Sequence, residues 1–176
     1  MPIYFWNDED GSKYKDAYFS TFKDKWNHGD FIRISDSGSL KIYGRSDSTL
    51  NPGGVRIGTS EIYRVVNCID IIEDSLVIGQ EWEGNQRIIL FVLMENDLPL
   101  SKDLVDKIKF QIKSSCSPRH VPSKIIKVKG IPYTINGKKV EVAVTKIIEG
   151  KSVTNKDAIS NPEALDQYKN IPELMD

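Results

Sequence analysis

Two loops of this sequence carry the residues best suited to chemistry on anionic groups. Lys138 and Lys139 follow Asn136-Gly137 at the end of the segment IPYTINGKK, where an ammonium group can face solvent or a negatively charged ligand. The second loop, GRSDSTLNPGGVRIG at residues 44–58, contains two arginines, one aspartate and adjacent glycines. Glycines let a ligand approach the backbone closely, and arginine matches phosphate oxygens. On composition alone, a turn-rich linker with solvated arginines and a solvated lysine are the more common explanations of these loops.

Other chemistries are not supported by the spacing of the reactive residues. IPYTINGKK differs from a phosphate-binding P-loop because Pro132 replaces the first glycine and Lys139 replaces the Ser or Thr that would hold magnesium. No G-x-S-x-G nucleophile motif occurs in the chain. His28 and His120 lie far apart and form no H-x-x-H or H-E-x-x-H pattern, so we expect no metal site.

The patterns between the loops predict strands. FIRIS (31–35) and LKIY (40–43) flank the turn-forming residues SDSGS, which predicts a β-hairpin. Residues 74–82 and 86–94 are rich in β-branched residues and are separated by turn-forming residues, so they predict a second pair of strands. Residues 124–129 predict a further strand. The chain is therefore expected to be α+β.

Helical periodicity accounts for the segments between these strands. We expect Thr59 or Ser60 to cap a helix whose apolar residues keep i, i+3, i+4, i+7 spacing. Ser101 is expected to cap a second helix, and residues 140–148 are interpreted as a third. The polar tail after Lys151 is expected to pack loosely.

Composition places the chain among folded cytoplasmic proteins. Its 176 residues are 39% hydrophobic and 28% charged, which is ordinary for a globular domain. Cys68 and Cys116 are far apart and form no CxxC motif, so neither a disulfide scaffold nor a zinc site is expected, and a reducing compartment is favoured. No apolar run approaches the ~18 residues of a membrane span, and no signal-peptide layout is present.

The charge is strongly uneven along the chain. Residues 101–151 contain twelve Lys and Arg but four Asp and Glu, whereas residues 47–100 contain three basic and nine acidic residues. A basic block in a nearly neutral chain indicates a local anionic partner, while nucleic-acid packaging proteins are more often basic throughout. Taken alone, this distribution leaves a nucleic acid, a nucleotide and a coenzyme open as partners.

Four motifs, taken in order, carry a resemblance to a known family. They are HGDF (28–31), YGRSDSTLNPGGVRIGTSEIY (43–63), SPRHVPSKI (117–125) and IPYTINGKK (131–139). Together they resemble successive motifs of the adenylate-forming acyl-CoA synthetases. The opening FWNDEDGSKY, the NPGGVRIGTSEIY form and the GKKVE ending are similar to the acetoacetyl-CoA synthetase branch of that family.

The resemblance implies the fold and the domain boundaries. It predicts the small C-terminal domain of this family, a three-stranded sheet with flanking helices, preceded by a β-hairpin remnant of a large AMP-binding domain. Residues 1–46 would end the large domain, residues 47–150 would form the mobile domain, and residues 151–176 would be a C-terminal extension. The rest of the large domain, with the acid pocket and most ATP contacts, is absent from this sequence, so the chain alone is expected to be inactive.

The resemblance also implies the reaction and its partners. Acetoacetate and ATP would give an acyl-adenylate and pyrophosphate, and CoA would then give the thioester and AMP. Mg²⁺ would accompany ATP and be held mainly by the large domain, in cis or in trans. Neither a nucleic acid nor a membrane is implied as a partner.

Residue roles follow from the same motifs. Lys138 would be the adenylation lysine, bridging the carboxylate and the α-phosphate. Asp30 would bind the ribose hydroxyls, aided by Arg45, and Arg56 would lie near the nucleotide phosphates. Asp47 would be the hinge on which the mobile domain swivels.

Two further residues would face CoA. Gly54 would lie where the pantetheine arm passes, because a side chain there would block it. Lys113 falls where related synthetases often place an arginine near the CoA nucleotide. The alternative function is a free-standing, non-catalytic module that binds CoA or a nucleotide.

Overall fold

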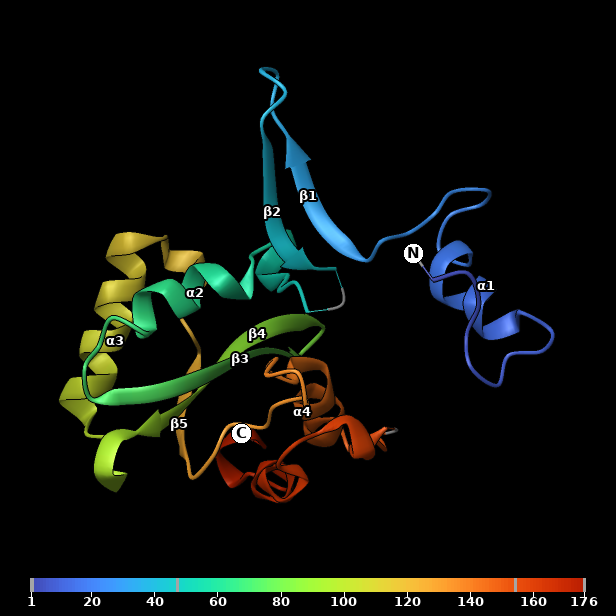
Figure 1. Cartoon of the computed structure of the whole chain (residues 1–176). Coiled ribbons are helices and arrows are strands. Elements are labelled where there is room, and N and C mark those ends of the chain that lie inside the picture. Colours follow the sequence, from blue (N-terminus) through green and yellow to red (C-terminus); the bar gives the residue numbers. More distant parts are fainter. Residues whose placement is uncertain (1, 47, 154, 176) are drawn as a thin grey trace. The chain divides into compact units, whose positions relative to one another are not determined.

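The computed structural model describes residues 2–46, 48–153 and 155–175 (Figure 1). The chain divides into an N-terminal unit, Met1–Asp30, and a second unit, Phe31–Asp176.

The N-terminal unit is built around aromatic contacts. It contains the helix α1 (Ser12–Phe19), which has no buried residue and whose first amides are capped by the Asp8 carboxylate, 2.9 Å from the amide of Lys13. The ring of Tyr18 lies 5.2 Å from Tyr14 and 5.7 Å from Phe5. Large apolar side chains remain exposed in this unit: Ile3, Tyr4, Trp6, Phe22 and Trp26.

Apart from its first residue, Asp30, the predicted hairpin belongs to the second unit. Strands β1 (Asp30–Ile34) and β2 (Leu40–Arg45) form a two-stranded sheet, which confirms the prediction. The turn closes through Gly38, whose φ of 79° is readily adopted by glycine. Four apolar side chains of the hairpin are exposed: Ile32, Ile34, Leu40 and Ile42.

The main sheet has three strands in the order β3-β4-β5. β3 (Ile72–Trp82) pairs antiparallel with β4 (Asn85–Met94), and β4 pairs parallel with β5 (Lys124–Val128). A tight turn cannot join parallel strands, so the connection from β4 to β5 runs through helix α3 (Lys102–Ser115). The three-stranded sheet, the flanking helices and the separate hairpin confirm the predicted α+β fold.

Helices and short 3₁₀ turns cover both faces of this sheet (Figure 1). Helices α2 (Thr59–Val66) and α3 lie on one face, and α4 (Glu141–Ile148) lies on the other, which confirms the helical interpretation of residues 140–148. The described ranges hold no helix with the length and apolar character that crossing a membrane requires. The 3₁₀ turns are η1 (Pro52–Gly54), η2 (Glu95–Asp97), η3 (Pro118–His120), η4 (Lys156–Ala158), η5 (Pro162–Tyr168) and η6 (Pro172–Leu174).

Alternation along the strands divides the core in two. Val77, Ile88 and Leu90 face the α2–α3 side, whereas Leu76 and Phe91 face the α4 side. All five are at most 2% exposed. Successive strand residues point to opposite faces, so a strand buried on both sides reads as a continuous apolar run.

The predicted cap of α2 is wrong. Thr59 and Ser60 lie inside the helix, and Gly58 occupies the capping position without a side-chain hydrogen bond. A Cβ built on Gly58 would lie 2.3 Å from the carbonyl oxygen of Tyr43 in β2. The close approach of the two backbones therefore requires glycine at this position, and this outweighs the usual preference for a capping side chain. Ser101, in contrast, caps α3 as predicted, accepting from the amide of Leu104 at 3.2 Å.

The loose packing predicted for the tail is also wrong. Side chains of the tail enter the core on the α4 side of the sheet, and Tyr168 is fully buried, with its ring 4.9 Å from Phe91. The buried tail residues are Ile159, Leu165, Tyr168 and Leu174. They are enough to fix the tail against β4 although most of its residues are polar.

Candidate functional site

The predicted adenylation lysine lies at the end of a tight turn. Tyr133 and Lys139 form an antiparallel bridge, and the chain reverses between them through Gly137, whose φ is 71°. Thr134 forms hydrogen bonds with both backbone groups of Lys138. Its amide donates to the carbonyl of Lys138 at 2.7 Å, and its hydroxyl accepts from the amide of Lys138 at 3.1 Å. The backbone of Lys138 is therefore fixed, while its side chain is exposed.

Lys139 lies in the opposite environment. Its ammonium group is 2.5 Å from Oδ1 of Asp74, donates to the carbonyl of Ser75 and lies 4.4 Å from the ring centre of Tyr63. The Lys139 and Asp74 side chains are 20% and 19% exposed. By contrast, the described residues offer no acceptor to the Lys138 ammonium group, which leaves Lys138 as the lysine of this pair that can reach a ligand.

Two tyrosines extend this ion pair into a network. Tyr133 donates its hydroxyl to the Asp74 carboxylate, and Tyr63 donates to Oε1 of Glu141 at 2.6 Å while accepting from the amide of Val77 at 2.9 Å. Burial and the neighbouring Glu141 carboxylate raise the pKa of Tyr63 well above 10.0. Burial and the hydrogen bond to Asp74 raise the pKa of Tyr133 as well. Both hydroxyls therefore remain donors at neutral pH.

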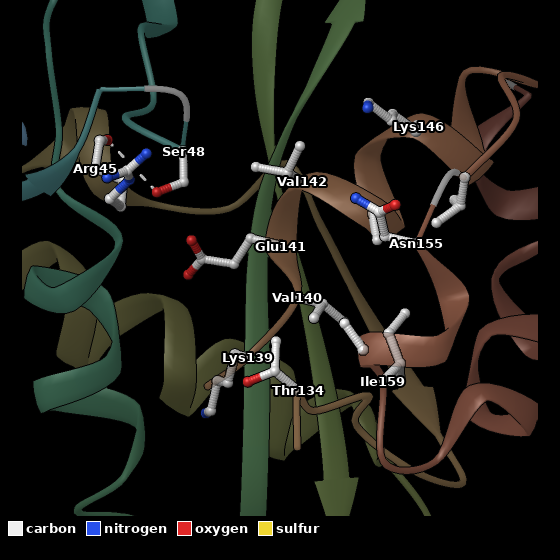
Figure 2. Close-up of a pocket in the computed structure, with 13 residues that line it drawn as sticks. Arg45, Ser48, Thr134, Lys139, Val140, Glu141, Val142, Lys146, Asn155 and Ile159 are labelled. Atoms are coloured by element: carbon white, nitrogen blue, oxygen red, sulfur yellow. Dashed lines mark hydrogen bonds between the residues drawn. The ribbon is translucent and has the colours of Figure 1, made fainter. Parts of the chain in front are cut away.

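A pocket of about 330 Å³ adjoins the turn (Figure 2). Thr134, Lys139 and Glu141 line it together with Arg45 and Ser48, which come from the end of β2 and the loop that follows. The pocket thus brings the predicted ribose-binding Arg45 beside the lysine turn. The carbonyl of Arg45 accepts from the hydroxyl of Thr49 at 2.6 Å, which helps to fix the start of this loop.

The glycine pair of the second loop forms an open stretch of backbone. Gly54 is exposed, has a φ of 80°, and would have no neighbour within 4 Å of an added Cβ. The amide of Gly53 donates to Oδ1 of Asn85 at 2.9 Å, and its added Cβ would lie 3.1 Å from Nη1 of Arg119. Bare backbone beside a guanidinium group suits an extended, anionic ligand.

The remaining predicted site residues are distributed over several elements. Arg56 is exposed, with its guanidinium 5.0 Å from the ring centre of Phe31. Lys113 is exposed in the last turn of α3. Asp30 belongs to the N-terminal unit, where its Oδ2 lies 2.6 Å from Nδ1 of His28. The predicted hinge, Asp47, falls outside the described residues.

Sequence reasoning missed two features of this site. One is the anchoring of Lys139 by Asp74, because the pairing joins segments 65 positions apart. The other is Arg119, which lies in the loop SPRHVP and packs over Gly53. The sequence feature that could have identified Arg119 is its place in the motif SPRHVPSKI (117–125).

The described residues hold no cluster of three or more His, Cys, Asp and Glu side chains that could bind a metal ion.

Comparisons with known proteins agree on one family. No family model matches the chain. It is 54% identical over 176 residues to acetoacetyl-CoA synthetase of Gallus gallus and 51% identical over 174 residues to acetoacetyl-coenzyme A synthetase of Rhizobium meliloti (strain 1021), covering 99% of this chain in each case. The solved structure of the acetoacetyl-CoA synthetase from Streptomyces lividans matches all of this chain with a TM-score of 0.88 and 42% identity.

The matched region is a fraction of each relative. The chain spans 26% of the Gallus gallus protein, 27% of the Rhizobium meliloti protein and 27% of the Streptomyces lividans chain. The similarity covers 99% to 100% of this chain. The chain is a homologue of the C-terminal portion of acetoacetyl-CoA synthetases, which are adenylate-forming enzymes.

Proposed function

We propose that this chain acts as the C-terminal part of an acetoacetate–CoA ligase and supplies its adenylation lysine, Lys138. The contrast between the two adjacent lysines carries the proposal. Asp74 and the Ser75 carbonyl hold Lys139, whereas the Lys138 ammonium group is exposed on a fixed turn. The relatives matched over this chain are named as acetoacetyl-CoA synthetases, which supports the choice of acid.

The reaction proceeds in two balanced steps. A carboxylate oxygen of acetoacetate attacks the α-phosphorus of ATP, a new O–P bond forms, and the bond to the β-phosphate oxygen breaks to release pyrophosphate. The sulfur of CoA then attacks the acyl carbonyl, the bond to AMP breaks, and the thiol proton is released. Mg²⁺ would arrive with ATP and be held mainly by the large domain.

Lys138 acts in the first step. Its ammonium group contacts the carboxylate and the α-phosphate together, so that two anions are held at attack distance and the charge that builds during displacement is offset. Arg45 and Asp30 bind the ribose hydroxyls, and Arg56 lies near the phosphates. Removing one preorganised donor of this kind typically costs on the order of 100- to 1,000-fold in rate.

Gly54 and Lys113 act in the second step, with Asp47 as the hinge between the two states. The exposed backbone at Gly54 gives room for the pantetheine arm, which supports this role. Lys113 attracts the phosphorylated nucleotide end of CoA. In this proposal residues 1–46 end a large domain, residues 47–150 form the mobile domain, residues 151–176 form the extension, and the enzyme is cytoplasmic.

The test joins this chain to the preceding part of the Gallus gallus relative, about three quarters of that protein, to give a complemented enzyme. We expect the complemented enzyme to form acetoacetyl-CoA and this chain alone to form none. Lys138→Ala should abolish acyl-AMP formation, measured by ATP–pyrophosphate exchange, and spare thioester formation from supplied acyl-AMP. Lys102→Ala, at an exposed lysine of α3, is the control. Equal loss of both steps would contradict the assignment.

The second candidate is a free-standing module that binds CoA or a nucleotide without catalysis. The second unit favours it in one respect: helices cover both faces of its sheet, so its core is complete without further protein. Tight CoA binding by the isolated chain, together with a complemented enzyme that forms no product, would support this alternative.

A further inference from the structure

The C-terminal tail forms backbone hydrogen bonds with residues 133–135, which lead to Lys138. Thr134 and Ile159 form an antiparallel bridge, and the amide of Ile135 donates to the carbonyl of Ala158 at 3.0 Å. The amide of Ser160 donates to the carbonyl of Tyr133 at 2.9 Å. Residues 155–168, called the clamp segment below, therefore pair with the lysine turn, residues 133–139.

Asn161 closes this pairing with its side chain. Its Oδ1 accepts from the amide of Tyr133 at 2.9 Å, and its Nδ2 donates to the carbonyl of Ile131 at 2.9 Å. One amide group thus satisfies a backbone donor and a backbone acceptor of the chain entering the lysine turn. A partly buried backbone group that loses such a partner destabilises the fold, because no hydrogen bond then compensates for its lost hydration.

Gln167 makes the same kind of paired contact with Lys129 and Gly130, just before the residues that Asn161 contacts. Its Oε1 accepts from the amide of Lys129 at 2.7 Å, and its Nε2 donates to the carbonyl of Gly130 at 2.8 Å. The Tyr168 hydroxyl also donates to the carbonyl of Gly130, at 3.1 Å. The clamp segment therefore follows the backbone from the end of β5 to the lysine turn.

The clamp segment is itself anchored in the core. Tyr168 and Leu165 are 0% and 2% exposed, and the Tyr168 ring contacts Phe91 of the central strand β4. The lysine turn is thus tied to the sheet through the tail on one side. On its other side, Lys139 is tied to β3 through Asp74.

Lys138 lies between these two attachments. A catalytic group must be held within about 0.5 Å of its productive position, and a misplacement of about 1 Å can cost on the order of 100-fold in rate. An exposed turn with a flexible glycine would not provide this by itself. The two attachments fix the backbone on either side of Lys138 and leave its side chain exposed.

We propose that the clamp segment is a positioning element for Lys138 and that Asn161 is its key positioning residue. This inference rests on the proposed role of Lys138 in adenylation. It assigns to residues 155–168 of the C-terminal extension a function in the first half-reaction alone.

The first measurement compares the two half-reactions in the complemented enzyme. Asn161→Ala should lower acyl-AMP formation about 10- to 100-fold and change thioester formation from supplied acyl-AMP less than twofold. Asn161→Asp keeps the acceptor for Tyr133 but loses the donor to Ile131, so a smaller loss is expected. The control is Asp166→Asn, which removes an exposed ion pair with Lys169 in the same segment without contacting the lysine turn. Equal loss of both half-reactions, or no loss in either, would overturn the proposal.

The second measurement follows amide hydrogen exchange in this chain without the large domain. Asn161→Ala should accelerate exchange at Tyr133, Ile135 and Lys138 about tenfold, with amides of β4 unchanged and the Asp166→Asn variant like the parent. Unchanged exchange at Lys138 would overturn the proposal. If Asn161→Ala fails to fold, the same readings are made on Asn161→Asp. Should Lys138→Ala leave acyl-AMP formation intact, the proposed function fails, and the exchange data still report whether the tail holds the turn.

Discussion

Lys138 and Lys139 are adjacent in the chain, yet one ammonium group faces solvent and the other is 2.5 Å from the Asp74 carboxylate. The bridge to Tyr133 involves Lys139 alone, whereas Lys138 lies at the exposed end of the turn. Lys139 anchors the turn, whereas the turn leaves the side chain of Lys138 exposed. Lys139 therefore has a structural role, and Lys138 is the residue available for chemistry.

Removal of the two lysines should affect stability very differently. Lys139→Ala leaves the Asp74 carboxylate without its cation in a largely buried place, so we expect a loss of about 3 kcal/mol in the free energy of unfolding. Lys138→Ala, at an exposed position, should change it by less than about 0.5 kcal/mol. Urea unfolding of the two variants measures both values.

A double variant tests the cause. Lys139→Ala combined with Asp74→Ala removes the unpaired charge, so it should be more stable than the sum of the two single variants predicts. Additive losses would show that the ion pair is not what anchors the turn.

Much of the fold was predictable because its strands and helices carry regular apolar patterns. The run from Ile88 to Val92 is apolar at every position, as a strand buried on both faces requires, and Ser101 precedes the helix that it caps. The tail was predicted wrongly because Ile159, Leu165 and Tyr168 follow neither a helical nor a strand period. Such isolated anchors, in 3₁₀ turns or directly after one, give no repeat that a sequence pattern can reveal.

The candidate site was predictable through its motifs and not through its contacts. Lys138, Gly54 and Arg56 stand in loops rich in turn-forming residues, and their roles remain predictions from resemblance. The attachments that hold the lysine turn join distant segments: Asp74 pairs with Lys139, and Asn161 with Tyr133. No local spacing encodes such pairings, because they depend on how the finished sheet brings its loops together.

Alkaline pH should destabilise the fold through its buried tyrosines. Burial raises the pKa of Tyr63 and of Tyr168, so both stay protonated in the folded chain at pH values where an unfolded tyrosine ionises. The two protonated tyrosines contribute fully to the free energy of unfolding below pH 10.0, the usual pKa of tyrosine. Above that pH the contribution is lost, and for Tyr63 the free energy of unfolding falls by up to about 1.4 kcal/mol per pH unit. Urea unfolding between pH 8 and 11 measures this decline.

The matched variants differ in burial. Tyr63→Phe should make the alkaline decline shallower although it also removes the hydrogen bonds to Glu141 and Val77. Tyr4→Phe, at a residue that is 76% exposed, should leave the decline unchanged. An identical decline in the parent and in Tyr63→Phe would show that Tyr63 ionises as freely when folded as when unfolded.

Lys113 should contribute to CoA affinity through an exposed charge. In the complemented enzyme, Lys113→Ala is expected to raise KM for CoA about two- to fivefold, the range for a solvent-exposed charge contact, and to leave acyl-AMP formation unchanged. The effect should shrink at high salt because exposed charges are screened. Lys107→Ala, at another exposed lysine of α3, provides the comparison. A rise in KM of the same size in both variants would assign the effect to the general charge of the helix.

Gly54 should matter to the second half-reaction because of the space above its backbone. Gly54→Leu introduces a side chain at an exposed position where an added Cβ meets nothing within 4 Å, so the protein itself can accommodate it. The side chain would, however, block a passing pantetheine arm, so we expect thioester formation to fall about 100-fold while acyl-AMP formation is retained.

The backbone strain of the substitution, about 1–2 kcal/mol for a side chain at positive φ, needs its own control. Gly38→Leu supplies it, since φ is 79° at Gly38 and 80° at Gly54 and both positions are open, but Gly38 lies at the tip of the hairpin. If Gly38→Leu lowers thioester formation as strongly as Gly54→Leu, the loss reflects backbone strain and Gly54 does not border the path of CoA.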